Sequence, residues 1–311
     1  MTTFEPIYFQ TYETGLLQKK VAEAHSRLKR CMLCPRECGV DRLSGETGFC
    51  STDKLSRVSS FSPHFGEEAP LVGNHGSGTI FFTHCNLLCL FCQNFDISHQ
   101  GQGQEATADE LAGMMIALQH QGCHNINFVS PSHVVPQILA AVEIAAENGL
   151  NLPLVFNTGG YDRVSTLKLL EGVFDIYMPD FKFWDSRIAA NSCQAGDYPE
   201  VARKALIEMH RQVGDLQIDA DGIARRGLLI RHLVLPGGLA GTREVMRFIA
   251  QKISPASYVN VMSQYRPCGR AAEVKGLEVP LSAEDFKNAV RVAKEEGIHR
   301  LDQPHRRFVF R

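Results

Sequence analysis

The 311-residue sequence predicts an α/β fold built on a parallel sheet, and two repeating patterns carry the prediction. Six short apolar runs have the composition of strands: 79–82, 126–129, 154–156, 174–178, 228–234 and 258–262. Helix-like segments separate them: 107–121, 134–148, 163–171, 199–213 and 242–253, with Thr107 and Thr242 as plausible caps. Strict alternation implies parallel pairing through right-handed crossovers. The fold is then an open doubly wound sheet or a full or partial barrel.

The chain before residue 78 lacks this alternation. One amphipathic helix is predicted at about 14–30, and residues 31–77 are rich in cysteine, glycine, proline and serine. They contain too little periodic apolar sequence to form a hydrophobic core of their own, so they need another stabilising element such as a bound metal. We expect an N-terminal helix and metal-binding segment (1–77), the α/β unit (78–267) and a C-terminal extension (268–311) to which we assign no chemistry.

Polar residues follow the predicted strands, at the ends where parallel α/β folds carry their working sites. They are His84 with Cys85, residues 130–133, residues 157–160, Asp180 with Lys182, and residues 263–265. Any one of these stretches could be an ordinary turn. Five of them in order predict a shared site.

The charge balance narrows the classes of function. Lysine and arginine total 32 against 34 acidic residues, a formal net charge of −2. Without a broad positive field, the sequence disfavours a protein that grips nucleic-acid backbones or anionic lipid. The first residues lack a basic stretch followed by an apolar core, and no apolar run has membrane-spanning length. We therefore expect a cytoplasmic protein.

Ten cysteines in such a chain indicate metal or redox chemistry, because disulfides do not persist in a reducing compartment. Seven of them form two tight groups: Cys31, Cys34, Cys38 and Cys50, and then Cys85, Cys89 and Cys92. Cys123, Cys193 and Cys268 stand alone, and we expect them to be inert small apolar residues.

The second group has the spacing C-x3-C-x2-C and directly follows the first predicted strand. Zinc sites and iron–sulfur cubanes bound by protein alone normally use four ligands. Three thiolates on a cubane leave one iron open to a chelating substrate. The alternative is a structural zinc site completed by His84 or His99.

This loop, with Phe91 before its last cysteine, resembles the signature of the radical S-adenosylmethionine superfamily. The sequence is similar to the branch named after the pyruvate formate-lyase activating enzyme, and more closely to uncharacterised homologues that begin with a four-cysteine segment. The resemblance spans about residues 31–267. It implies a partial (β/α)6 TIM-like barrel and a [4Fe–4S] cluster on Cys85, Cys89 and Cys92 whose unique iron binds S-adenosylmethionine. One electron would cleave the sulfonium and give a 5′-deoxyadenosyl radical that abstracts hydrogen.

The resemblance also implies roles for residues at the strand ends. Asp180 and Lys182 match the Asp-x-Lys of the activating enzymes, which contacts the cosubstrate or the reacting peptide, and His232 matches a histidine near the adenosyl group. Cofactor contacts are expected from the following residues: Phe91, Asn157, Thr158, Gly159, Ser130, Ser132 and His133. The last three stand where the family has Gly-Gly-Glu, so the methionine amino group would meet hydroxyls and an imidazole without a carboxylate.

Plainer interpretations stand beside these roles. His232 lies in an apolar strand and could be a core histidine with one hydrogen-bond partner. Asp180 and Lys182 could be a surface ion pair, although alternation puts them on one side of an extended segment.

The first cysteine group is a complete set of four thiolates. The pair Cys31 and Cys34, with the long gap before Cys50, suits zinc. The run C-x2-C-P-x2-C that ends at Cys38 suits an auxiliary iron–sulfur cluster able to deliver electrons to the second group. No metal at all is the third alternative, and because both metals take sulfur tetrahedrally the spacing does not separate them.

The sequence thus predicts a radical S-adenosylmethionine enzyme, one candidate role being an activase that installs a glycyl radical on a partner enzyme. A radical modification of another peptide or of a small metabolite is the second alternative, because fold does not determine substrate. A non-catalytic iron–sulfur electron-transfer protein is the third, favoured by the missing Gly-Gly-Glu. The expected partners are a reductant such as flavodoxin or ferredoxin and the protein substrate.

Overall fold

The computed structural model describes residues 4–302, and one sheet runs through it. The strands are β1 (Ser56–His64), β2 (Ser77–Phe82), β3 (Gln104–Ala106), β4 (Ile126–Val129), β5 (Leu154–Thr158), β6 (Ile176–Pro179), β7 (Gln217–Ile218), β8 (Ala224–Leu233), β9 (Tyr258–Met262) and β10 (Arg300–Leu301). Their order is β10-β9-β8-β6-β5-β4-β2-β1-β3, and β7 pairs with β8 off this path.

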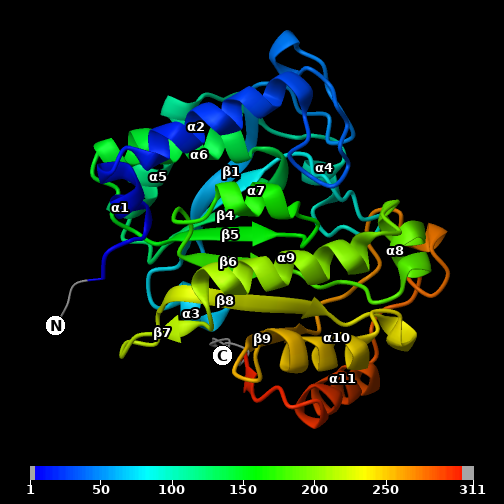
Figure 1. The fold of residues 1–311 in the computed structure, drawn as a ribbon. Helices are drawn as coiled ribbons and strands as arrows, with labels where there is room; N and C mark the ends of the chain where they lie inside the picture. Colours follow the sequence, from blue (N-terminus) through cyan, green and yellow to red (C-terminus); the bar gives the residue numbers. More distant parts are fainter. Residues whose placement is uncertain (1–3, 303–311) are drawn as a thin grey trace, which may run out of the picture.

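The six predicted strands are β2, β4, β5, β6, β8 and β9, and each pairs in parallel with the next. The prediction of a mostly parallel α/β fold is therefore confirmed. Parallel neighbours bring all six carboxyl ends to one edge of the sheet, which is the edge at the arrowheads of β5 and β8 in Figure 1.

Eleven α-helices lie among the described residues 4–302. They are α1 (Tyr8–Glu13), α2 (Leu16–Ser26), α3 (Ala69–Val72), α4 (Phe95–Ser98), α5 (Ala108–His120), α6 (Val135–Glu147), α7 (Val164–Leu169), α8 (Ser186–Cys193), α9 (Tyr198–Val213), α10 (Thr242–Phe248) and α11 (Ala283–Glu295). Helix α5 begins at Thr107 with a capping box to Glu110, as the sequence predicts. Thr242 instead starts α10 as its first residue, after Gly241.

The two faces of the sheet bury different clusters, because side chains alternate along each strand. Leu154 and Phe156 of β5 belong to the large core with the surrounding helices. Val155 between them joins a second, smaller cluster. Its other members come from β6, the residue before β7, β8, β9 and α3. They are Ile176 and Met178, Leu216, Ala224 and Leu229, Tyr258, and Leu71. We call the face that carries this cluster the inner face; α2, α5, α6 and α9 lie on the other (Figure 1).

The sheet extends past the alternating region at both edges. The serine-rich strand β1 pairs antiparallel with β2, and β3 pairs with β1. Their sequences carried no strand signal, because β3 has only three residues and β1 from Ser59 onward is half-buried or exposed, and such residues need no apolar alternation. At the other edge β10 pairs with β9, and α11 packs against α10. Residues 303–311, with the predicted tail around His305, lie outside the described part.

No helix within residues 4–302 is both long and apolar enough to cross a bilayer. This finding agrees with the expectation drawn from the apolar runs of the sequence.

Tyr198, the first residue of α9, ties together the loops that follow β5 and β6. Its hydroxyl lies 3.0 Å from the carbonyl oxygens of Gly159 and Asp180 and accepts the Lys182 backbone N–H at 2.9 Å. The side chain is fully buried. The two loops are therefore fixed to each other through one hydroxyl group.

Tyr198→Phe should lower the free energy of unfolding by about 1–3 kcal/mol, because a buried N–H and a buried carbonyl lose their partner. Urea denaturation measures the change. Tyr12→Phe on α1 is the control, because the Tyr12 hydroxyl has no partner in the described chain. A loss no larger than that of the control would contradict this role of Tyr198.

Candidate functional site

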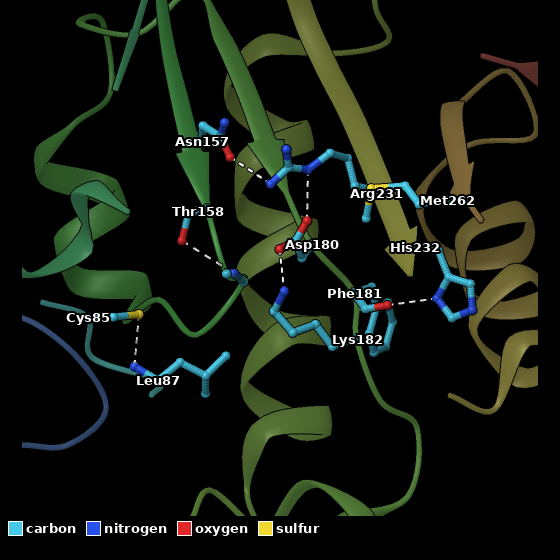
Figure 2. Close-up of polar contacts among 12 residues, drawn as sticks. Cys85, Leu87, Asn157, Thr158, Asp180, Phe181, Lys182, Arg231, His232 and Met262 are labelled. Atoms are coloured by element: carbon cyan, nitrogen blue, oxygen red, sulfur yellow. Dashed lines mark hydrogen bonds and ion pairs between the residues drawn. The ribbon is translucent and has the colours of Figure 1, made fainter. Parts of the chain in front are cut away.

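A buried ionic network joins the carboxyl ends of β5, β6 and β8. Asp180 accepts from Arg231 Nε at 2.8 Å through one carboxylate oxygen and from Lys182 Nζ through the other. Arg231 Nη2 also donates to Asn157 Oδ1 at 2.7 Å. Figure 2 shows the four side chains converging between the strands. Two cations thus share one carboxylate on the inner face.

The charges of this network support one another. Burial alone would raise the pKa of Asp180, but Arg231 and Lys182 outweigh burial and hold it below its usual value. Burial lowers the pKa of Lys182, but the charges of Asp180 and Cys89 and the hydrogen bond to Asp180 together outweigh burial, so the net pKa rises. All three groups are therefore ionised at neutral pH.

Gly160 lets the β5 and β6 loops approach each other. Its φ is +78°, and a Cβ there would overlap the Asp180 carbonyl oxygen. Only glycine meets both demands.

Cys85, Cys89 and Cys92 lie in the loop between β2 and α4. The Leu87 N–H and the Ser98 hydroxyl each point at a thiol sulfur, those of Cys85 and Cys92, at 3.3 Å. The loop is fixed by Asn86 Nδ2, which donates to the Tyr161 carbonyl at 2.7 Å. Sulfurs that already receive hydrogen bonds suit thiolate ligands of an iron–sulfur cluster, so these residues fit the [4Fe–4S] group that the sequence implies.

The cysteine loop borders the ionic network. The Lys182 charge acts on the Cys89 thiol, and the Cys89 charge acts in turn on Lys182. Leu87 lies against Gly159, and so does the Lys182 side chain. Burial raises the pKa of Cys85 to about 12, so binding of a metal would have to displace its proton.

Ser132 and Thr158 share a carboxylate that sequence reasoning missed. Asp162 accepts from the Ser132 and Thr158 hydroxyls at 2.6 Å each. Burial raises the pKa of Asp162 to about 6, against the two hydrogen bonds that lower it. Thr158 lies on the opposite face of β5 from Asn157, so of these two predicted cofactor contacts only Asn157 joins the ionic network.

The structure does not bring His232 to the network. His232 lies next to Arg231 and therefore on the other face of β8. Its Nδ1 donates to the Phe181 carbonyl at 2.7 Å, and Nε2 lies 3.0 Å from the Thr242 hydroxyl. Burial lowers the pKa of His232 to about 4. This arrangement is that of a neutral core histidine, and Arg231 stands in the site in its place.

Four further predicted contacts have other neighbours. Phe91 is buried edge-on against Phe183 with ring centroids 5.9 Å apart. His133 is buried with Nε2 at 3.0 Å from the Thr83 carbonyl, and burial lowers its pKa to about 3. Ser130 adopts a positive φ of 60° just before His133. Gly159 contributes its carbonyl to Tyr198.

The first cysteine group encloses a small cavity. Cys31, Cys34, Cys38 and Cys50 all line it, together with Arg42 and His133. Arg42 is 1% exposed and donates to the carbonyls of Asp53 and His133 at 2.8 Å. Its Nη1 lies 3.9 Å from Cys31 Sγ, and its Nη2 has no partner within residues 4–302. Within residues 4–302, no three His, Cys, Asp or Glu side chains lie close enough together to hold a single metal ion. This holds for the two cysteine groups as well.

Arg36 joins the two cysteine segments. Its Nε donates to the Asn86 carbonyl at 2.9 Å and its Nη2 to the Cys193 carbonyl at 2.8 Å. The guanidinium lies 3.7 Å from the centroid of Phe49. The four-cysteine cavity is thus fastened directly to the Cys85–Cys92 loop.

No family model matches the chain. It is 32% identical over 292 residues to the uncharacterised protein MJ0674 of Methanocaldococcus jannaschii, covering 91% of this chain and 80% of that protein. Among solved structures it resembles HydG, a maturase of the [FeFe]-hydrogenase, with a TM-score of 0.50 and 12% identity over 72% of this chain. The match spans 49% of HydG. Methylornithine synthase (PylB) matches with a TM-score of 0.45 and 18% identity over 70% of this chain and 62% of PylB.

The likeness to HydG concerns the fold. It shows that the mixed α/β fold of this chain, with its mostly parallel sheet, is shared with HydG over the matched region. The predicted partial barrel is confirmed to this extent.

Arg231→Met should lower the free energy of unfolding by about 3–5 kcal/mol, because it leaves the buried Asp180 with a single cation. Urea denaturation at neutral pH measures the effect. Arg187→Met is the matched control, since the Arg187 side chain is 91% exposed and its removal should cost less than about 0.5 kcal/mol. Equal losses in the two variants would show that the network is not held as described.

Proposed function

The chain belongs to the same family as the uncharacterised M. jannaschii protein MJ0674, and from the geometry of its site we propose that it is a radical S-adenosylmethionine enzyme. One observation carries the proposal. The loop with Cys85, Cys89 and Cys92 leaves β2 at the strand end where the buried network around Asp180 lies, with Lys182 close enough to act on Cys89. The partial-barrel fold supports it.

The three cysteines would hold a [4Fe–4S] cluster as thiolates. When bound, the cluster would supply one electron that splits the sulfonium of S-adenosylmethionine into methionine and a 5′-deoxyadenosyl radical, which then takes a hydrogen atom from the substrate. The N–H of Leu87 and the hydroxyl of Ser98 would stabilise negative charge on two of the sulfurs.

The residues of the network would orient the cosubstrate and the substrate. Lys182 offers ammonium protons not used by Asp180, and Asn157 offers an amide nitrogen, since only its oxygen is bonded to Arg231. Asp162 is buried and accepts from Thr158 and from Ser132, a residue of the stretch that stands where the resembling family has Gly-Gly-Glu. We assign it the role of fixing those two hydroxyls.

Exclusion of water follows from burial. Asp180 and Asn157 are nearly inaccessible, and below them the inner face is filled by Val155, Met178 and Leu229. A radical formed here would meet protein groups on its inner side rather than solvent.

The finer proposal concerns the target. The Asp-x-Lys pair and the cysteine loop resemble the activating enzymes, so we assign the chain a protein substrate, with installation of a glycyl radical as the reaction. A one-electron donor of the flavodoxin or ferredoxin class would reduce the cluster. An electron paramagnetic resonance signal of a glycyl radical in a candidate partner tests this assignment, and its absence from every glycyl-radical enzyme of the source organism would refute it.

Anaerobically reconstituted protein should release 5′-deoxyadenosine from S-adenosylmethionine when dithionite is added, as measured by chromatography. Cys89→Ala should abolish release, because two cysteines do not hold the cluster. Cys123→Ala, a buried cysteine remote from both groups, is the control and should retain it. Release by Cys89→Ala at the level of the control would exclude the proposal.

We further propose that Cys31, Cys34, Cys38 and Cys50 hold a second metal centre. A buried guanidinium with an unused Nη2 and no carboxylate partner in the described chain needs a negative neighbour. Four thiolates would supply that charge, and Arg42 would balance it. A single divalent metal would require the four side chains to move closer together, whereas an iron–sulfur cluster takes more widely spaced thiolates.

Metal and sulfide analysis of anaerobically purified protein tests the second centre. Cys34→Ser should lose either one zinc or one set of iron and sulfide relative to the wild type, while Cys123→Ser, beside Gly78 at the start of β2, should lose neither. The element that disappears identifies the centre. Unchanged metal and sulfide in a folded Cys34→Ser protein would contradict it.

A further inference from the structure

A cavity of about 840 Å³ opens beside the ionic network. Its wall is formed by residues 65–68, by residues 260–264 at the end of β9, and by α11 with the chain that follows it. Gln93, the residue after Cys92, donates from Nε2 to the Gln264 carbonyl in this wall at 2.8 Å. The cavity therefore lies next to both the cysteine loop and the network.

Carboxylates outnumber cations on the inner wall and in the network behind it. Arg231 lies in the wall, bonded to Asp180, with Nη1 at 3.8 Å from Glu67 Oε2. The cations are Arg231 and Lys182, and the carboxyl groups are those of Asp180, Glu67 and Glu68. Glu67 is also paired with His64 at 3.3 Å on its outer side. Glu68 is the carboxyl group left without an ionic partner at bonding distance.

Glu68 has unused acceptor capacity. It is 4% exposed, and its Oε1 accepts from Asn260 Nδ2 at 2.8 Å. Its Oε2 has no hydrogen-bond partner in the described part of the chain. An unsatisfied buried oxygen is costly, so a ligand that donates to it gains binding energy. Arg231 donates from Nε and Nη2 within the network, and its Nη1 faces Glu67, so Glu68 Oε2 is the buried acceptor of this wall that has no hydrogen-bond partner in the described chain.

Another part of the cavity lining is apolar and suits an alkyl chain of a ligand. Phe65 and Phe286 line it with Val290 and Leu301. Lys294 and Asp302 add one charge of each sign to this lining, the Asp302 carboxylate accepts from the Tyr258 hydroxyl at 2.6 Å, and His299 is exposed.

We infer that the substrate of this site carries a cationic group, an ammonium or guanidinium at the end of an apolar arm, which donates to Glu68 Oε2. The inference rests on the proposed function for the identity of the reaction, but the binding itself needs no cluster. Burial raises the pKa of Glu68 to about 7, and a donor cation would hold the carboxylate ionised. A basic side chain of a peptide and a free amine share this chemistry.

Calorimetry on the full-length protein tests the inference with three probes. They are N-acetyl-lysine methylamide, the same compound acetylated at Nε, and cadaverine. The lysine probe should bind roughly tenfold more tightly than its acetylated form, a difference of about 1.4 kcal/mol. Tighter binding of the lysine probe than of cadaverine identifies a peptide substrate, and the reverse order identifies a free amine.

Glu68→Gln keeps the volume and removes the charge, and it should bring the two lysine probes within about twofold of each other. Glu147→Gln, at an exposed position of α6, should leave the preference unchanged. Equal affinity of the wild type for the charged and acetylated probes would overturn the inference, and this comparison holds even if Glu68→Gln does not fold. Loss of 5′-deoxyadenosine formation with the preference intact would refute only the proposed function.

Discussion

The sharing of Asp180 between two cations is the interaction on which the rest of the site depends. Burying a carboxylate without partners would cost several kcal/mol, and burying Arg231 or Lys182 alone would cost as much. The three groups are tolerated together because β6 and β8 bring them within bonding distance on the inner face. The β5 and β6 loops meet at this point. Tyr198 holds them together through its hydroxyl, and Gly160 allows the close approach because it has no side chain. The network in turn places fixed charges beside the cysteine loop and beside the cavity at β9.

The two cysteine groups are connected to each other by hydrogen bonds from arginine side chains. Arg36 bonds to the carbonyl of Asn86 within the second group, and Arg42 bonds to His133, whose ring contacts the carbonyl of Thr83. The N-terminal segment has little core of its own, so these buried arginines and the charge they require account for its attachment. A metal centre there would stabilise the same loop that is proposed to hold the catalytic cluster.

The sequence predicted the parallel strands, the strand-end location of the site and the Asp180–Lys182 pair, because alternation and parallel pairing are local patterns with one geometric outcome. The sequence pattern did not show which of Arg231 and His232 faces the site. The two are neighbours in one strand, and which of them faces inward depends on the register of β8 with β6. Asp162 and Glu68 escaped notice because a lone carboxylate in a loop carries no signal until its neighbours are known. Strand β1 was missed because its residues from Ser59 onward are half-buried or exposed and need no apolar period. Helix α11 has a Ser282 cap and one buried face, but it lies in the C-terminal extension, outside the strand–helix alternation.

The central claim is that S-adenosylmethionine binds a cluster held by Cys85, Cys89 and Cys92. Electron–nuclear double resonance of the reduced protein tests it most directly, with S-adenosylmethionine labelled with ¹⁵N in its amino group and ¹³C in its carboxylate. Hyperfine coupling of both labels to the cluster is expected in the wild type and in Cys34→Ser. A reduced cluster that shows no coupling to either label would contradict it.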